Sequence, residues 1–195
     1  MNLLSNELSK RKMAFAIAAL FLITIGMLLW QGRVPFCECG SIKIWTAAVV
    51  SAENSQQLFD PYSFTHITHG VALFFLLWLF ARKIPLRKRF VVAVALEALW
   101  EILENSAFVI ERYRAATISL NYYGDSVFNT VGDIFAMMLG FYIVSKLSWR
   151  WSLGVVIVLE LLLLYFIRDN LILNMVMLLH PIPAIQAWQA ALSGL

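Results

Sequence analysis

Five stretches of this chain are apolar over about the length of a membrane-spanning helix, and this pattern constrains the fold more than any other feature. They cover residues 13–30, 64–81, 90–110, 126–145 and 152–168. A spanning helix needs roughly 20 predominantly apolar residues. Only 14% of the 195 residues are charged, whereas a typical soluble domain has about 25%. The sequence therefore predicts an all-α fold, a polytopic transmembrane bundle of about five spans that forms a single membrane domain over residues 1–195.

Lysine and arginine residues are unevenly distributed between the connecting segments. With the N-terminus inside, ten of them fall on the inner side and five on the outer side. The inner set is Lys10, Arg11, Lys12, Arg82, Lys83, Arg87, Lys88, Arg89, Lys146 and Arg150, and the outer set is Arg33, Lys43, Arg112, Arg114 and Arg168. The positive-inside rule then predicts a cytoplasmic N-terminus in a bacterial inner (plasma) membrane. No small-x-small cleavage pattern follows the first stretch, which we interpret as a retained span.

Two segments outside the spans carry structural signals. In the outer loop, residues 31–62, the apolar spacing of Ile42, Trp45 and Val49 predicts a short amphipathic helix. The apolar stretch 171–179 is too short to span and is followed by two closely spaced prolines. We therefore expect residues 171–195 to form an interfacial or re-entrant segment. No basic run is interleaved with aromatic residues, so the expected partners are membrane lipids and not nucleic acid.

The only cysteines, Cys37 and Cys39, lie in the outer loop, on the oxidising side of the membrane in this orientation. A disulfide between them would be a local staple for the loop. A redox or metal-binding role is the alternative, although no further cysteine is available to complete such a site.

Ionisable side chains recur inside the apolar stretches at helical spacing. Glu97, Glu101 and Glu104 share one face of the third span, and His66 and His69 are neighbours in the second. Asp125, Asn129 and Asp133 follow one face of the fourth span, and Glu160 lies in the fifth. At about 1.5 Å per residue, most of these groups fall in one layer roughly 8–12 Å below the outer boundary, with Glu97 deeper.

A carboxylate in the centre of a span costs about 2.5–3.5 kcal/mol on insertion scales. The acids must therefore be neutral, reached by water, or neutralised by a metal ion. Histidine and carboxylate side chains are suitable ligands for Zn, Mn or Mg, so a divalent metal ion is the expected cofactor. The predicted metal ligands are His66, His69, Glu101 and Asp125, and the predicted catalytic residues are His69, Glu101, Glu104 and Asp133.

The segment between the two acidic spans contains cations and aromatic residues at the outer surface. Arg112 and Arg114 have the chemistry to hold a phosphate or carboxylate, with Tyr123 and Asn129 close by in sequence. We predict these four as substrate-binding residues; an interfacial anchor is an equally good interpretation of the segment.

The chain resembles a family of bacterial inner-membrane proteins that is defined as a domain of unknown function. The resemblance rests on Cys37-Glu38-Cys39-Gly40, Glu53-Asn54-Ser55-Gln56, the run Ser63 to Gly70 with its two histidines, Arg168-Asp169-Asn170-Leu171, and the run from Glu97 to Asp133 that contains Glu-Arg-Tyr-Arg-Ala-Ala-Thr-Ile-Ser-Leu. It covers nearly the whole chain and implies no particular activity. A fainter similarity, in spacing only, links His69, Glu101, Arg114, Asp125, Asn129 and Asp133 to VanZ-type membrane proteins.

Three functions remain open from the sequence. The first is an intramembrane, metal-dependent hydrolase or transferase that acts on a lipid or lipid-linked phosphate at the outer leaflet. The second is a proton-coupled transporter with the acids as a relay. The third is a non-catalytic assembly factor or accessory subunit whose polar groups pair between helices.

Overall fold

The computed structural model describes residues 7–116 and 122–193, and every regular element in these ranges is a helix. The elements are α1 (Lys10–Trp30), α2 (Ser63–Ala81), α3 (Leu86–Glu104), α4 (Ala107–Ala116), α5 (Val127–Val144), α6 (Trp149–Ile167), α7 (Leu171–Leu179) and α8 (Pro183–Ser193). Residues 117–121, part of the motif used above, lie outside the described ranges.

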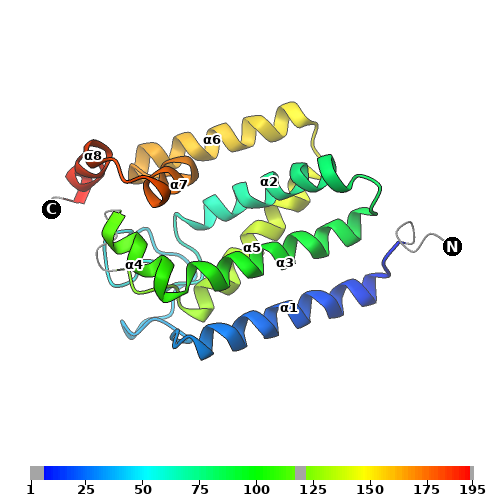
Figure 1. Cartoon of the computed structure of the whole chain (residues 1–195), viewed down its shortest axis with the longest axis horizontal. Helices are drawn as coiled ribbons and strands as arrows, with labels where there is room; N and C mark the ends of the chain where they lie inside the picture. The colour runs from blue at the N-terminus through cyan, green and yellow to red at the C-terminus, as the bar shows by residue number, and fades with distance from the viewer. Residues whose placement is uncertain (1–6, 117–121, 194–195) are drawn as a thin grey trace.

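The long helices form a bundle whose two ends differ. Within the described ranges, α1, α2, α5 and α6 are long and apolar enough to cross a membrane. The glutamate-bearing helix α3 runs alongside them, so that the five long helices share the long axis of the molecule (Figure 1). Short turns join α2 to α3 and α5 to α6 at one end, whereas residues 31–62, α4, α7 and α8 gather at the other. We call the latter the loop end of this helical membrane bundle.

Helix α5 lies at the centre of the bundle because glycines allow close packing against α2. A Cβ atom on Gly70 would overlap the backbone of Met137, and one on Gly140 would overlap the backbone of Ile67. Small residues at such crossings let two helix backbones approach each other. Below the polar residues, the core is an apolar cluster of Ala93, Val94, Ile134, Met137 and Phe141.

The prediction of one continuous span over 90–110 was wrong, because the helix breaks after Glu104. The Asn105 side chain bonds to Asp125 in both directions: its Nδ2 donates to Oδ2 (2.8 Å) and its Oδ1 accepts from the backbone N–H (2.6 Å). Ser106 then begins the next turn, since its Oγ accepts a bond from the N–H of Val109. These side-chain bonds compete with the helical backbone, and α4 starts afresh at Ala107.

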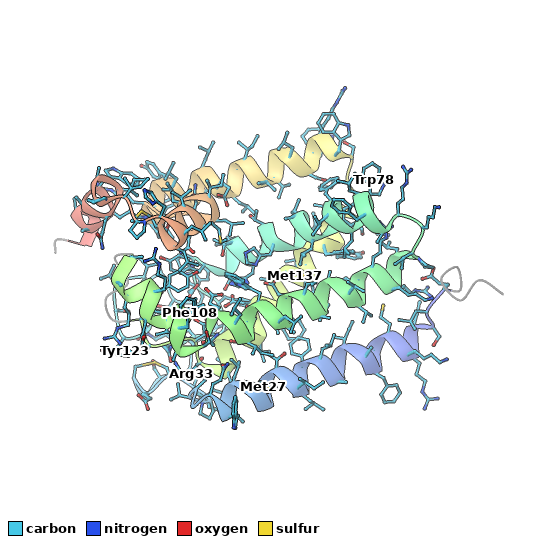
Figure 2. All side chains as sticks on the ribbon, in the orientation of Figure 1. Met27, Arg33, Trp78, Phe108, Tyr123 and Met137 are labelled. Atoms are coloured by element: carbon cyan, nitrogen blue, oxygen red, sulfur yellow. A yellow bond between two sulfur atoms is a disulfide. The ribbon has the colours of Figure 1, made fainter. Side chains whose placement is uncertain are left out.

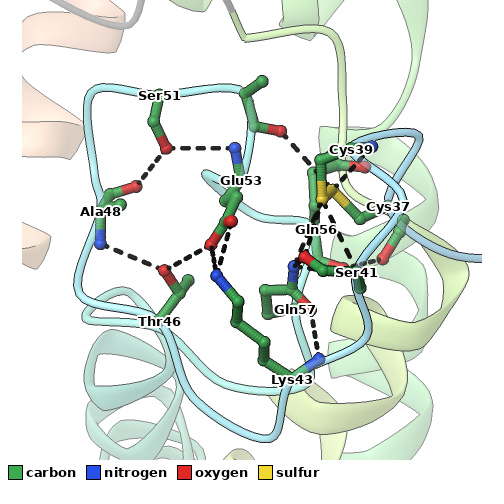
Figure 3. Close-up of a disulfide and its surroundings, with 12 residues drawn as sticks. Cys37, Cys39, Ser41, Lys43, Thr46, Ala48, Ser51, Glu53, Gln56 and Gln57 are labelled. Atoms are coloured by element: carbon green, nitrogen blue, oxygen red, sulfur yellow. Dashed lines mark hydrogen bonds and ion pairs between the residues drawn. A yellow bond between two sulfur atoms is a disulfide. The ribbon is translucent and has the colours of Figure 1, made fainter.

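The predicted amphipathic helix in the outer loop was also wrong, because residues 42–49 contain no helix in the structure. Their backbone instead pairs with a later part of the loop: Leu58 N donates to Lys43 O and Phe59 N donates to Ile44 O. The loop also contains a disulfide between Cys37 and Cys39 (Figure 3).

The chain after α6 forms two short helices at the loop end (Figure 1). Helix α7 has nine residues and so is about 14 Å long, which is too short to cross a membrane. Asn170 caps its N-terminus by accepting a bond from Leu173 N (2.8 Å), and the helix ends at Leu179, before the extended residue His180.

Candidate functional site

Two imidazoles and a carboxylate meet between α2 and α3. Nδ1 of His66 lies 2.6 Å from Oε1 of Glu97, and Nδ1 of His69 lies 3.1 Å from the same oxygen. The histidines are three residues apart and therefore occupy neighbouring positions on the helix surface. Glu97 is almost fully buried. Both imidazoles of α2 thus contact the same carboxylate oxygen of Glu97 on α3.

Further carboxylates surround His66. Its Nδ1 lies 3.3 Å from Oε1 of Glu101, and its Nε2 lies 3.9 Å from Oδ2 of Asp133 on α5. Glu101 is completely buried, and neither of its oxygens has a hydrogen-bond partner among the described residues. A buried acceptor without a partner costs about 1–3 kcal/mol, and more when it is charged. Folding therefore leaves both carboxylate oxygens of Glu101 without a hydrogen bond from the described residues.

The cluster contains two sets of side chains whose ligand atoms lie within 4.8 Å of one another. One set is His66, His69 and Glu97, and the other is His66, Glu101 and Glu104. Metal–ligand bonds of about 2.0–2.2 Å place the ligand atoms of a tetrahedral zinc roughly 3.3 Å apart. The spacing therefore fits a metal ion after small side-chain adjustments.

A small cavity, which we call the site cavity, opens beside these groups. Its walls include His66, His69, Trp100, Glu104, Asp133 and, from α7, Asn174. Its volume of about 50 Å³ is several times the roughly 10–15 Å³ that one water molecule requires. The cavity therefore has room for a few water molecules or for a small reacting group.

The Trp100 ring lies edge-on to His69, with ring centroids 6.0 Å apart. Its Nε1 is buried and donates to none of the described residues. Trp100 therefore adds an unsatisfied donor to the wall of the site cavity.

A hydrogen-bonded chain from the outer loop fixes Asp133. Ser63 Oγ donates to Asp133 Oδ1 (2.6 Å), and Asp60 N donates to Ser63 Oγ (3.2 Å). The Asp60 carboxylate in turn accepts bonds from the N–H groups of Ser55 and Tyr62. Burial raises the pKa of Asp60 to about 6, although these backbone bonds act in the opposite direction.

The structure brings together most of the predicted metal and catalytic residues. His66, His69, Glu104 and Asp133 line the site cavity, whereas Glu101 contacts His66 from a fully buried position.

Asp125 also reaches the cavity wall, but it belongs to neither set of metal-compatible residues. Its carboxylate is held by Asn105 (2.8 Å) and Tyr122 (3.0 Å). Burial raises the pKa of Asp125, against the effect of these two hydrogen bonds. The geometry therefore does not support Asp125 as a metal ligand.

The four predicted substrate-binding residues do not line the site cavity. Arg112 caps the end of α7, since its Nε donates to Leu178 O (2.7 Å) and its Nη2 to Leu179 O (3.3 Å). Arg114 stacks on the ring of Tyr123, with its guanidinium carbon 4.9 Å from the centroid. Tyr123 is exposed, at the same end of the molecule as Arg33 (Figure 2).

Asn129 is buried and donates from Nδ2 to Gln57 O (2.8 Å). The structure therefore does not bring these four side chains to the site cavity, and their role in substrate binding stays a prediction. Their hydrogen-bonding and stacking groups are used in contacts within the protein.

Two more predictions concern acids in the spans. Glu97 is central to the cluster. Counting residues from the end of the span had placed it deeper in the membrane than the other polar groups. It lies one helical turn from Glu101 on the same face of the helix, and this spacing was the signal that could have included it. Glu160 does not line the site cavity, because its Oε2 accepts from Ile172 N (3.3 Å) at the start of α7.

The cysteine pair lies outside the site cavity, in the outer loop. Cys37 is buried and Cys39 is exposed. Gln57 Nε2 lies 3.6 Å from Cys39 Sγ and also donates to Ser41 O (3.2 Å; Figure 3). The disulfide therefore lies within the hydrogen-bonded part of the loop that packs on α5 through Asn129.

Comparison with known proteins places the chain in a family. Residues 28–191 match the model described as "Protein of unknown function (DUF2585)". The chain belongs to the DUF2585 family. This match includes α2, α3 and α5, which carry the site, so the His/carboxylate cluster lies within the DUF2585 region.

Similar proteins occur in several bacteria. A UPF0314 protein of Paracoccus denitrificans is 49% identical over 165 residues, which is 85% of this chain and 86% of that protein. A UPF0314 protein of Brucella anthropi is 44% identical over 179 residues, 92% of this chain and 91% of its own. UPF0314 protein R03235 of Rhizobium meliloti is 43% identical over 187 residues, 95% of both chains. No solved structure matches the chain. The fainter similarity to VanZ-type proteins stays a prediction.

Proposed function

We propose that this chain is a metal-dependent hydrolase or transferase that acts on a lipid or lipid-linked phosphate at the outer surface of a bacterial inner membrane. The observation that carries the proposal is the cluster of His66, His69, Glu97 and Glu101 beside a cavity of about 50 Å³. Buried carboxylates are retained at functional sites despite their cost. A divalent cation would satisfy both oxygens of Glu101.

The ligand types favour zinc or manganese over magnesium. Imidazole is a good ligand for zinc and related transition metals, whereas magnesium prefers oxygen ligands and keeps several waters. His66 and His69 supply two nitrogens, and Glu97 supplies an oxygen close to both. Glu101, as a second carboxylate, would balance the two charges of the ion.

The cavity wall supplies the other groups that hydrolysis or transfer requires. A divalent ion supplies an activated water or a polarised ester oxygen. Glu104 and Asp133 line the cavity and are placed to accept or return a proton. Trp100 Nε1 is free among the described residues to donate to a substrate oxygen. Arg112 and Arg114 are engaged elsewhere, so neither is placed to contact a substrate in the site cavity.

The distribution of charge supports the proposed side of the membrane. The ten basic residues assigned to the inner side flank the ends of helices opposite the loop end. The loop end then faces outward under the positive-inside rule. The site cavity lies at that end, because its wall includes residues of the outer loop and of α7.

The proton-coupled carrier is less well supported. A relay would need polar groups that continue from the cluster toward the inner side. In the described part of the bundle, the buried cluster on that side consists of Ala93, Val94, Ile134, Met137 and Phe141. A polar pocket at one end of the bundle is more typical of a binding or catalytic site than of a transport path.

The test combines metal content with activity. Full-length protein is purified in detergent without added metal, and bound metals are measured by plasma mass spectrometry. Vesicles of bacterial phospholipids are then incubated with the protein, and released phosphate esters are quantified. We expect stoichiometric zinc or manganese and a metal-dependent release in the wild type, and loss of both in His69→Ala and Glu97→Gln. Glu111→Gln, at an exposed position on α4, is the control.

Two outcomes would overturn the proposal. One is a wild-type protein that carries no stoichiometric metal and acquires none on titration with zinc or manganese. The other is His69→Ala and Glu97→Gln proteins that bind metal and release product like the wild type. An assembly role would instead appear as variants that fail to fold, which melting curves distinguish from folded, inactive protein.

A further inference from the structure

A second and larger cavity, which we call the outer cavity, lies at the loop end. It is formed between the segment after α1 and the residues before α5, with Arg33, Glu38, Cys39, Gln56, Tyr123 and Asp125 in its wall. Its volume is about 660 Å³, within the roughly 300–1,000 Å³ of typical ligand sites. The site cavity is far too small for a whole substrate, whereas the outer cavity has the size of a polar headgroup with room to spare.

The two cavities share part of their walls. Asn54 and Asp125 line both of them. Asn54 Oδ1 is buried and accepts no hydrogen bond from the described residues. The two cavities are therefore adjacent, with Asn54 and Asp125 between them.

Arg33 presents an incompletely used guanidinium to the outer cavity. Its Nη1 donates to the carbonyl oxygen of Tyr123, and its Nη2 lies 3.4 Å from Gln31 O, a long hydrogen bond. Its Nε is buried and has no partner among the described residues. A guanidinium is a planar cation whose N–H groups match the oxygens of a phosphate.

The other charges in the wall are negative. Glu38 is exposed at the cavity, and Asp125 lies at the shared wall. A guanidinium and the exposed Glu38 carboxylate in one wall favour a ligand that carries both signs of charge over a bare anion. A phosphate joined to a short amine has this pattern.

We propose that the outer cavity binds a zwitterionic phosphate ester of the phosphoethanolamine type, with its phosphate on Arg33 and its ammonium group toward Glu38. As a headgroup subsite for catalysis, this inference rests on the proposed function. Binding itself requires only the outer cavity and its charges. The ligand can be a lipid headgroup or a water-soluble ester, because both present the same chemistry.

Calorimetric titration of the full chain in nanodiscs of phosphatidylglycerol tests the binding. Phosphoethanolamine and inorganic phosphate are the two probes. We expect phosphoethanolamine to bind more tightly than phosphate. Arg33→Gln should weaken both by about tenfold or more, as expected for the loss of charge-assisted hydrogen bonds. Glu38→Gln should weaken only phosphoethanolamine, toward the level of phosphate, and Arg150→Gln, at the opposite end of the bundle, should change neither.

A second variant covers the case in which Arg33→Gln disturbs the fold through the lost bond to Tyr123. Ala52 is exposed and lines the outer cavity, so Ala52→Trp should block binding by bulk and leave the melting temperature unchanged. The inference is overturned if the wild type binds neither probe, or if both folded variants bind phosphoethanolamine like the wild type.

The source of the ligand and the proposed function are tested in the same samples. In nanodiscs of phosphatidylethanolamine, loss of binding of the soluble probe identifies the lipid headgroup as the occupant, and unchanged binding identifies a soluble ester. Metal content is measured in parallel. Metal-free protein that still binds phosphoethanolamine refutes the proposed function alone, and metal-loaded protein that binds neither probe refutes this inference alone.

Discussion

The imidazole of His66 lies with Nδ1 2.6 Å from Oε1 of Glu97, across the hairpin formed by α2 and α3. His69 adds a second nitrogen to the same oxygen at 3.1 Å. A single carboxylate with two imidazole partners is well satisfied. The neighbouring Glu101 has no hydrogen-bond partner among the described residues. This difference between two glutamates one turn apart indicates a site that is complete only with a ligand.

Glu101→Gln should stabilise the metal-free protein while weakening its response to metal. Its buried carboxyl group has no hydrogen-bond partner among the described residues, and replacing a buried polar group without such a partner gains roughly 1–3 kcal/mol. Melting temperatures with chelator and with zinc provide the measurement. A lower melting temperature in chelator would mean that the carboxylate is a structural partner of the helices.

Gly70→Ala should destabilise the bundle by about 1–3 kcal/mol or more, because the new Cβ would overlap the Met137 carbonyl oxygen. Gly154→Ala on α6 is the matched control, since a Cβ there meets nothing within 4 Å and alanine is the better helix former. Unfolding in a denaturing detergent series measures both. Equal stability of the two variants would contradict the close α2–α5 packing.

The link between α6 and α7 should weaken as the pH rises. Burial raises the pKa of Asp169 from its ordinary 3.8 to about 6. A carboxyl with a raised folded-state pKa contributes stability that is fully present below pH 3.8 and is lost as the pH passes through about 6. The loss is on the order of 1–3 kcal/mol.

The Asp169→Asn variant tests this dependence. The wild type should melt at a higher temperature at pH 5 than at pH 7.5, and the difference should shrink in Asp169→Asn but not in the exposed Glu111→Gln. An unchanged pH profile in Asp169→Asn would assign the dependence to another group.

Arg112→Gln should loosen α7 without abolishing metal binding, because Arg112 donates to the last carbonyls of this helix. Cations near a helix C-terminus are typically worth about 0.3–1 kcal/mol, and up to about 2 when partly buried. Hydrogen exchange measured by mass spectrometry should increase over residues 171–179 relative to Arg114→Gln. Unchanged exchange together with weakened phosphate binding would restore the original substrate-binding role of Arg112.

The membrane bundle could be predicted from the sequence because its signal is local. Each long helix contains its own run of apolar residues, and helical spacing alone places His66 beside His69 and Glu97 beside Glu101. The break at Asn105 could not be predicted in this way, because it depends on bonds to Asp125, 20 residues away in sequence. The apolar stretch to residue 110 gave no sign of it.

The roles of the cations depended on contacts that no sequence pattern reveals. Arg112 donates a hydrogen bond to the end of α7, and Arg114 stacks on the ring of Tyr123. Arg33, which precedes Val34-Pro35 in the outer loop, gave no spacing signal, and yet it lines the outer cavity. Which of several arginines remains available is decided by tertiary structure.

The hairpin of α2 and α3 has a consequence for biogenesis. The ribosome delivers α2 before α3, so both histidines are already in the bilayer when Glu97 arrives, and the carboxylate meets its partners within the nascent hairpin. Glu101 enters at the same time, but Asp133 follows only with α5. We therefore expect the release of α3 from the translocon to depend on His66 and His69. A nascent chain that carries alanine at both positions should remain bound to the insertion machinery.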